Sequence, residues 1–482
     1  MAGGTARVIQ VVEPQNLDPA VLTNVWALTA VVGNALFGTL MTNDPETGKL
    51  KFTMAEDFSS SDGGATFTLK LRPGLKFSDG SPLDAEAVKF NWDRIKAPAT
   101  GSRSIREAAE IASTKAMDAT TLKVTLVRPN PHYPQAVPSS SLNWIASPKA
   151  LKAGRQAFDA KPVGAGPFTL KKWTRQNSIE LVKNPGYWDA PKPYLEALTI
   201  RTAPDSGQRL NTMMSGGADV AMESSWATVD KAENAGLLTY SPSLSGGQYL
   251  SMNMRKAPFD DVRARKAVAA AIDFDAYNLA VSEGKAESVR TLFTKSSPFY
   301  SDTELQKTDK ATAQKLFDEL AAEGKPVSFT FKAMSTAHNK ATAENIQAQL
   351  SAFKNVDVKV EIVDPAALLG LYASHDFDMM VEGGFFGDPE PRLWGALAGR
   401  SAGNYSGVDD KELNAALDAG RTGKTTAERK AAYQTVQERL AELTPIIFTY
   451  RTAATTITSK KVHGVVQYGL GSLLPEELWI QK

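Results

Sequence analysis

The sequence predicts an α/β fold, because strand and helix patterns interleave along the whole chain of 482 residues. Apolar and polar residues alternate in segments 66–71 and 122–126, and over most of segment 356–363. Such alternation is typical of strands with one buried face. A chain of this length is too long for a single core, so we expect two or three domains. No long linker or internal repeat interrupts the pattern, which favours domains built from chain that crosses between them.

Helices are indicated by apolar residues at three- and four-residue spacing. Segment 425–443 begins with Thr425 and Glu428 in a capping-box arrangement, and Pro445 ends it. A second helix is expected over 260–272, where paired aspartates suit the positive end of the helix dipole. These helices add to the prediction of a mixed α/β architecture.

Two local patterns predict fixed backbone features. Asp84 is expected to cap a helix that carries Val88 and Trp92. Gly164 and Gly166 stand just before a strand and suit a close crossing of two backbone segments. Both features are structural and carry no chemistry of their own.

The bulk composition excludes several classes of function. Lys and Arg number 54 against 53 Asp and Glu, and this balance gives no reason to expect a nucleic-acid partner. The chain has no cysteine, which excludes disulfides and thiolate nucleophiles. Segment 27–41 is too short and too polar to span a bilayer. The start of the sequence shows no export signal, so either the protein is cytoplasmic or a signal segment has been removed.

Catalytic and metal-binding patterns are also weak. The four histidines are His132, His338, His375 and His463, and no two have the spacing of metal ligands on one helix. No Gly-x-Ser-x-Gly elbow occurs. The sequence therefore predicts neither an enzyme nor a bound cofactor. A hydrolase remains an alternative, because carboxylates that lie far apart in the chain can still meet in space.

Four segments together resemble one family in order and spacing. The first, 34–95, holds LFGTL at 36–40, DPETG at 44–48, AEDF at 55–58 and the specific run FTLKLRPGLKFSDGSPLDAEAV at 67–88. The second holds PVGAGPF at 162–168, KNPGYW at 183–188 and GGADV at 216–220. The third holds NMRKAPFDDVR at 253–263 and AID at 271–273, and the fourth runs from NYSG at 404–407 to Pro445. On these motifs the chain resembles the peptide/nickel/opine-binding family (family 5) of solute-binding proteins of bacterial ABC importers.

The resemblance implies a two-lobed fold of the periplasmic-binding-protein type (class II, the large three-segment form), with a hinge and a ligand cleft between the lobes. Lobe I would comprise 1–40, 161–245 and 450–482, with a peripheral subdomain at 41–160, and lobe II would comprise 246–449. The implied partners are a small-molecule ligand and an ABC permease in the membrane. The implied protein is a monomer, located outside the cytoplasm in the periplasm or as a cell-surface lipoprotein, and its export signal would be absent from this sequence.

The resemblance also bears on the ligand. Relatives that bind peptides carry an Asp four residues before the proline of an Asp-Pro pair, where it neutralises the peptide ammonium, and here Phe385 stands at that position before Pro389. Relatives specific for dipeptides carry an Arg before a Pro-Tyr-Asn stretch, and the matching segment 335–339 has no Arg. Because an unpaired buried charge is costly, both departures favour a non-peptide ligand. Binding of di- or oligopeptides stays open as the alternative, with Asp388 as the amine partner, and so does a hydrolase or a sensor on the same fold.

Twelve residues are candidates for ligand contact. In lobe I they are Thr23, Asn24, Trp26, Arg103, Trp144 and Trp226, and in lobe II they are Tyr249, Phe385, Phe386, Asp388, Trp394 and Tyr405. Each aromatic taken singly fits a core equally well or better, Arg103 fits a solvated loop, and Asp388 fits a turn. The glycines around Phe385 and Phe386 favour a close approach of ligand and backbone. An aromatic-rich cleft suits an apolar or aromatic molecule or a sugar, and the lack of histidines there disfavours nickel or haem.

Overall fold

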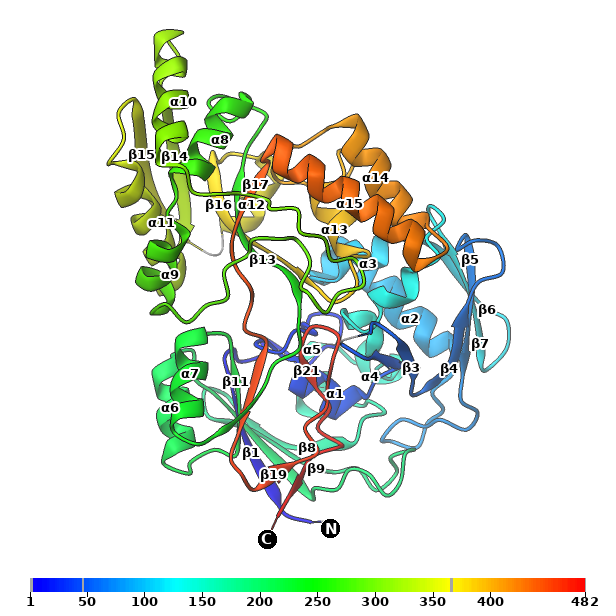
Figure 1. The fold of residues 1–482 in the computed structure, drawn as a ribbon. Helices are drawn as coiled ribbons and strands as arrows, with labels where there is room; N and C mark the ends of the chain where they lie inside the picture. Colours follow the sequence, from blue (N-terminus) through cyan, green and yellow to red (C-terminus); the bar gives the residue numbers. More distant parts are fainter. Residues whose placement is uncertain (1–2, 46, 365–366, 482) are drawn as a thin grey trace. The chain divides into compact units, whose positions relative to one another are not determined.

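The structure is a computed structural model that describes residues 3–45, 47–364 and 367–481. The chain forms two compact units, unit 1 (Met1–Ser243 and Ala453–Lys482) and unit 2 (Leu244–Thr452). It therefore passes from one unit to the other near residues 243 and 452. Strands and helices alternate through both units (Figure 1), as the periodicity predicts.

The main sheet of unit 1 has seven strands in the order β12-β18-β11-β1-β10-β9-β8. In chain order these strands are β1 (Thr5–Gln10), β8 (Phe168–Thr174), β9 (Ser178–Lys183), β10 (Ala197–Thr202), β11 (Val220–Glu223), β12 (Leu238–Tyr240) and β18 (Thr455–Thr458). β1 pairs in parallel with β10 and β11, whereas the other neighbours are antiparallel. The C-terminal segment thus supplies a strand to a sheet that starts at the N-terminus.

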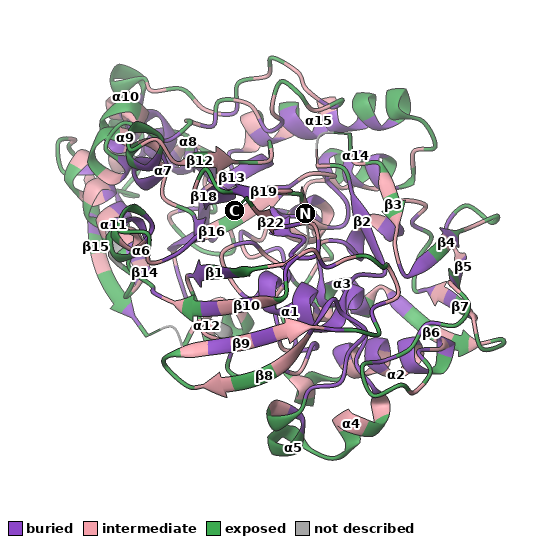
Figure 2. Cartoon of the chain, turned by 90° about the horizontal axis from the view of Figure 1, so that it is seen from below, coloured by how far each residue is buried: buried purple, intermediate pink, exposed green. Residues whose placement is uncertain are grey.

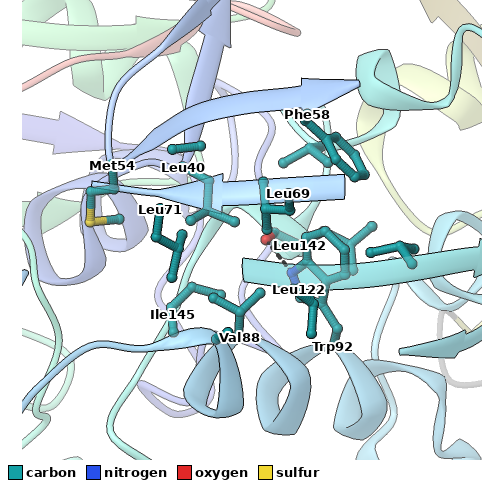
Figure 3. Packing of buried hydrophobic residues seen from close by; sticks show 14 of the residues in the cluster. Leu40, Met54, Phe58, Leu69, Leu71, Val88, Trp92, Leu122, Leu142 and Ile145 are labelled. Carbon is teal, nitrogen blue, oxygen red and sulfur yellow. Dashed lines mark hydrogen bonds between the residues drawn. The ribbon is translucent and has the colours of Figure 1, made fainter. Parts of the chain in front are cut away.

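A second sheet in unit 1 has the order β4-β5-β7-β6 and packs on helix α2 (Ala85–Lys96). Its strands are β4 (Ala55–Ser59), β5 (Thr66–Leu71), β6 (Ile111–Ala116) and β7 (Thr121–Leu126), so the predicted strands at 66–71 and 122–126 are confirmed. Asp84 accepts a hydrogen bond from the Ala87 N–H and caps α2, also as predicted. Trp92 is fully buried between helix and sheet, and its Nε1 donates to the Leu142 carbonyl at 2.8 Å (Figure 3).

The remaining elements of unit 1 surround these two sheets. The helices are α1 (Ala30–Phe37), α3 (Ile105–Ala109), α4 (Pro148–Lys152), α5 (Arg155–Ala160), α6 (Ser206–Met214) and α7 (Trp226–Asn234), with single 3₁₀ turns at Pro98–Thr100, Tyr133–Ala136 and Ser141–Asn143. Short strand pairs are β2 (Met41–Asn43) with β3 (Leu50–Phe52), β19 (Val462–His463) with β22 (Trp479–Ile480), and β20 (Gln467–Tyr468) with β21 (Ser472–Leu473). α1 is buried along its whole length (Figure 2), as its apolar composition on all sides requires.

The last turn of α1 and the glycine-containing turn before β8 cross at very short range. A Cβ added at Gly164 would lie 2.2 Å from the Leu36 carbonyl oxygen, and one at Gly166 would lie 2.3 Å from that of Ala35. The close crossing predicted for these two glycines is therefore confirmed.

Unit 2 is built on a five-stranded sheet in the order β15-β14-β16-β13-β17. The strands are β13 (Ser245–Met252), β14 (Val327–Met334), β15 (Val356–Val363), β16 (Met379–Phe386) and β17 (Ile446–Tyr450). The helices are α8 (Val262–Ala271), α9 (Phe274–Ser282), α10 (Lys310–Ala322), α11 (Ala337–Leu350), α12 (Leu368–Ser374), α13 (Arg392–Leu397), α14 (Lys411–Thr422) and α15 (Thr426–Leu443). The predicted strand at 356–363, the aspartate at the start of α8 and the capping box of α15 are all confirmed.

Arg451 anchors unit 2 where the chain enters and leaves it. Its guanidinium donates to the carbonyl oxygens of Gly246 at 2.6 Å, Leu292 at 3.0 Å, Thr291 at 2.7 Å and Phe293 at 3.2 Å. The residue is 4% exposed, so these carbonyls take the place of water around its charge. We call this set of contacts the Arg451 clamp.

Candidate functional site

The predicted residue Phe385 lies on a partly open face of the unit 2 sheet. β13 and β16 are antiparallel, and their register sets Gln248 opposite Gly383. Gly383 is exposed, and a Cβ added to it would lie 3.3 Å from Cε1 of Phe385. The aromatic ring therefore covers a position that has no side chain, beside the Gln248 carboxamide. The glycines flanking Phe385 thus open the sheet surface, as their sequence context indicated.

His338 and Tyr450 complete this face, and we call Gln248, His338, Gly383, Phe385 and Tyr450 the Phe385 face. Tyr450 on β17 pairs with Gln248 in the sheet, and His338 reaches them from the first turn of α11. The His338 Nε2 lies 2.7 Å from the Gln248 Oε1 and 2.5 Å from the Tyr450 hydroxyl oxygen. Burial lowers the pKa of His338 to about 4, so its ring is neutral at physiological pH.

Tyr249 and Phe386, both candidates from the sequence, lie on the opposite side of the strands. They are 6% and 2% exposed and belong to the hydrophobic core of unit 2. Tyr249 packs edge-on against Phe448 with ring centroids 5.5 Å apart. Because side chains alternate between the faces of a strand, Phe385 and Phe386 cannot share one environment. Both rings pack in this core, and their assignment to a ligand remains a prediction.

Asp388 is held by an ion pair inside unit 2. Its two carboxylate oxygens accept hydrogen bonds from Arg429 at 2.9 and 2.7 Å. The two side chains are only 11% and 7% exposed. A carboxylate that is occupied in this way has little to offer a ligand ammonium, and the candidate role of Asp388 remains a prediction.

The other two candidates of unit 2 are partly buried and engaged with neighbours. Trp394 on α13 donates its Nε1–H to Asp418 at 2.9 Å, and the guanidinium of Arg421 lies 4.5 Å from its ring centroid. Tyr405 stacks on Tyr372 with ring centroids 4.0 Å apart and ring planes within 4°. Neither residue belongs to the Phe385 face, and their assignment to a ligand remains a prediction.

In unit 1 three of the candidates are enclosed. Trp144 is fully buried and donates its Nε1–H to Asn34 at 2.9 Å, while its ring fills the space above Gly33. Asn24 is 1% exposed and lies in a polar network with Tyr468 and Ser472. Trp26 is 3% exposed and donates to the Glu223 carbonyl at 2.8 Å. These side chains present little surface in unit 1, and their assignment to a ligand remains a prediction.

Thr23, Trp226 and Arg103 keep accessible surface in unit 1. Thr23 is half-buried, and its backbone N–H donates to the Thr29 hydroxyl at 2.7 Å. Trp226 is the first residue of α7 and is half-buried. Arg103 is exposed in the loop before α3. These residues remain candidates for ligand contact.

The chemistry of the Phe385 face is that of a binding surface. It combines an aromatic ring, a carboxamide, a phenol and a neutral imidazole, which supply apolar contact and hydrogen bonds without a formal charge. Across the described ranges, no three His, Cys, Asp or Glu side chains come close enough to hold a metal ion. Within the same ranges, no helix is both long and apolar enough to cross a bilayer. Sequence reasoning missed Gln248 and Tyr450, since neither stands in a recognisable motif.

Comparison with known families decides the broader assignment. Residues 49–404 match the model of the bacterial extracellular solute-binding proteins, family 5 middle region. The chain belongs to this family. The resemblance inferred from the sequence motifs is thereby confirmed.

Family 5 proteins with curated descriptions include relatives of moderate identity. The glutathione-binding proteins GsiB of Escherichia coli K12 and of Shigella flexneri are each 31% identical to this chain over 339 residues. Each alignment covers 70% of this chain, which spans 65% of the length of the relative.

Solved structures of the family share the fold over nearly the whole chain. The periplasmic binding protein AgaA of A. tumefaciens R10, in complex with agropinic acid, has a TM-score of 0.85 at 24% identity and 99% coverage of both chains. The Helicobacter pylori protein DppA, in complex with the peptide STSA, has a TM-score of 0.83 at 23% identity and covers 100% of this chain and 99% of its own. NikA from Brucella suis, in complex with Fe(III)-EDTA, has a TM-score of 0.82 at 22% identity, with coverage of 99% and 100%. These matches confirm the predicted α/β fold of the periplasmic-binding-protein type.

Proposed function

We propose that this protein is the extracytoplasmic solute-binding component of a bacterial ABC importer, and that its ligand is a non-peptide small molecule. The family assignment supports the class of function. The Phe385 face supports the ligand class, because an aromatic ring stands there among uncharged polar groups. By the resemblance of the sequence motifs, Phe385 stands where a peptide-binding relative would carry the carboxylate that neutralises the ligand ammonium.

The proposed mechanism is closure of two lobes on the ligand. A ligand that contacts both lobes favours the closed state by the difference between its affinities for the two states. The closed form would then deliver the ligand to a membrane permease. We expect the protein to act as a monomer and to be exported, either to the periplasm or as a lipoprotein.

The state of Asp388 supports a non-peptide ligand. Asp388 was the remaining acidic candidate for an amine partner, and the buried ion pair with Arg429 occupies both of its carboxylate oxygens. Freeing this carboxylate would leave the Arg429 charge buried and unpaired, which costs about 3–5 kcal/mol. A peptide ammonium would need another carboxylate to compensate it.

A peptide-like ligand is the second candidate. It is favoured by the 31% identity to glutathione-binding proteins, since glutathione is itself a small peptide with an ammonium group and two carboxylates. A hydrolase on the same fold finds less support, because the His338 ring contacts Gln248 and Tyr450 and not a serine.

A thermal-shift screen tests the proposal directly. The panel would hold glutathione, tetrapeptides, oligosaccharides, agropinic acid, nickel complexes and small aromatic acids. A ligand that binds only the folded protein stabilises it by about 2.7 kcal/mol at a hundredfold excess over its dissociation constant. A shift with a non-peptide that is lost in Phe385→Asp would support the proposal. A shift with peptides alone would favour the second candidate, and no shift with any class would contradict a role in solute binding.

A further inference from the structure

The contact between Gln248 and His338 fixes the orientation of a side-chain amide. The Gln248 Oε1 lies 2.7 Å from the His338 Nε2. A carboxamide oxygen only accepts hydrogen bonds, so in this contact Nε2 carries the proton and donates it. The Tyr450 hydroxyl oxygen lies 2.5 Å from the same nitrogen and is its second hydrogen-bond partner. The amide oxygen of Gln248 is therefore turned toward the imidazole.

Because His338 is neutral, its tautomer is linked to the orientation of the Gln248 amide. A neutral imidazole has one N–H and one acceptor nitrogen, and the partner of Nε2 decides which tautomer forms. Burial keeps the ring neutral, with a pKa lowered to about 4. We infer the tautomer with the proton on Nε2 from the Gln248 contact, because the Oε1 atom there can only accept a hydrogen bond.

The amide nitrogen of Gln248 takes no part in the contact with His338. It has no hydrogen-bond partner among residues 3–45, 47–364 and 367–481, and Gln248 is half-buried. Gly383, the cross-strand partner of Gln248, is exposed and has no side chain. The Phe385 ring lies beside Gly383, with its Cε1 3.3 Å from the position of an added Cβ. Two N–H donors thus lie next to an aromatic surface.

The N-terminus of α11 adds a positive electrostatic field to the two N–H donors of Gln248. His338 lies in the first turn of this helix, which spans Ala337–Leu350 and has no acidic residue in that turn. The N-terminus of a helix carries a partial positive charge, which favours a negative group and disfavours an ammonium. The amide donors and the helix end therefore select for the same kind of ligand group.

We propose that Gln248 is a specificity-determining residue whose amide nitrogen binds a carboxylate or carbonyl oxygen of the ligand beside Phe385, with His338 as the residue that positions the amide. This inference rests on the proposed function and narrows its ligand to a molecule with an aromatic or apolar body and an acceptor group. It also predicts discrimination against the corresponding amine.

The first test reads the tautomer of His338 in the free protein. Nitrogen-15 NMR of the imidazoles, with His338→Gln as the variant that assigns the signal, should show the proton on Nε2 at pH 7. A proton on Nδ1 would overturn the inference, because Gln248 would then turn its nitrogen toward the ring and its oxygen outward. This result needs no ligand, so it is independent of the proposed function.

The second test compares three probes with the same ring: 4-hydroxyphenylacetate, tyramine and 4-hydroxyphenethyl alcohol. Titrations followed by NMR should show the acid binding at least tenfold more tightly than the amine. Gln248→Glu, which replaces the amide donors by a carboxylate, should remove this preference. Gln156→Glu, at an exposed position of α5, is the matched control and should leave it unchanged.

The possible outcomes separate the inference from the proposed function. Equal binding of acid and amine, a preference retained in Gln248→Glu, or no binding of the acid would each overturn the role of Gln248. His338→Ala should weaken binding of the acid but not of the alcohol, and His338→Gln should restore part of the loss by donating its own amide. A sugar or neutral compound that binds in the thermal-shift screen would keep the proposed function while the inference fails.

Discussion

Arg429 on α15 holds both carboxylate oxygens of Asp388, at 2.9 and 2.7 Å, in an environment where the two side chains are almost fully buried. The same guanidinium lies 4.8 Å from the ring centroid of Phe299 and donates through Nε to the Gly420 carbonyl. The turn that follows β16 is thus tied to α14 and α15 by one residue. The Asp388–Arg429 ion pair therefore stabilises the framework of unit 2 and is not a member of the Phe385 face.

Breaking this pair should destabilise the protein without changing ligand preference. Asp388→Asn leaves a buried arginine without its counter-charge, so we expect a loss of about 3–5 kcal/mol in the free energy of unfolding. Urea denaturation would measure it. Lys340→Met, which breaks a pair whose side chains are 57% and 56% exposed, should change stability by less than about 1 kcal/mol. A loss of binding for amines alone in Asp388→Asn would show that Asp388 does contact the ligand.

Phe385 and Phe386 form a matched pair for separating binding from packing. Phe385→Ala removes a half-buried ring and should abolish or weaken ligand binding with little loss of stability. Phe386→Ala removes a ring that is 2% exposed, and it should cost about 3–5 kcal/mol. Calorimetric titration and denaturation of both variants would check this. The reverse outcome, with Phe385→Ala the more destabilised, would contradict the assignment of the two faces.

The glycine crossing before β8 should tolerate no side chain. Gly166→Ala would place a methyl group 2.3 Å from the Ala35 carbonyl oxygen, so we expect a variant that folds poorly or not at all. Gly395→Ala is the control, because no atom lies within 4 Å of its added Cβ and the residue is in the interior of α13. It should stabilise the protein by up to about 1 kcal/mol. Circular dichroism melting curves of the two variants provide the measurement.

Glu476 should make stability depend on pH near neutrality. Burial raises the pKa of its carboxyl from 4.5 to about 7, and the residue is 5% exposed. A carboxyl with a raised pKa in the folded state contributes its full stability below pH 4.5 and loses it as the pH rises to about 7, a loss of about 3 kcal/mol. Glu476→Gln should flatten the stability profile between these values, as measured by denaturation at several pH values. An unchanged slope in the variant would assign the effect to other groups.

Much of the fold could be predicted from local pattern. The alternation at 66–71, the capping box of α15 and the glycines at 164 and 166 are properties of short segments, and each has the predicted structure. The site was harder to predict, since its members meet only through the tertiary fold. His338 is 90 residues from Gln248 and 112 from Tyr450.

The burial of individual aromatic residues was the hardest feature to predict. Trp144 and Phe385 both stand in segments that the family pattern places near a ligand, yet Trp144 is fully buried and Phe385 is not. Ring size and sequence context cannot distinguish the two, because burial depends on what packs above the ring. Asp388 was ambiguous for a similar reason, since its partner Arg429 lies 41 residues further along the chain.

The Arg451 clamp has a consequence for the topology of the chain. Arg451 and Gly246 are hydrogen-bonded at 2.6 Å, so the two ends of unit 2 are neighbours. The Ser241 and Thr455 hydroxyls, at the matching ends of unit 1, lie 2.7 Å apart. Unit 2 therefore has the topology of an insertion in the chain of unit 1. Each unit could be expressed alone, unit 2 as a fragment with adjacent termini and unit 1 with a short glycine linker in place of the removed residues.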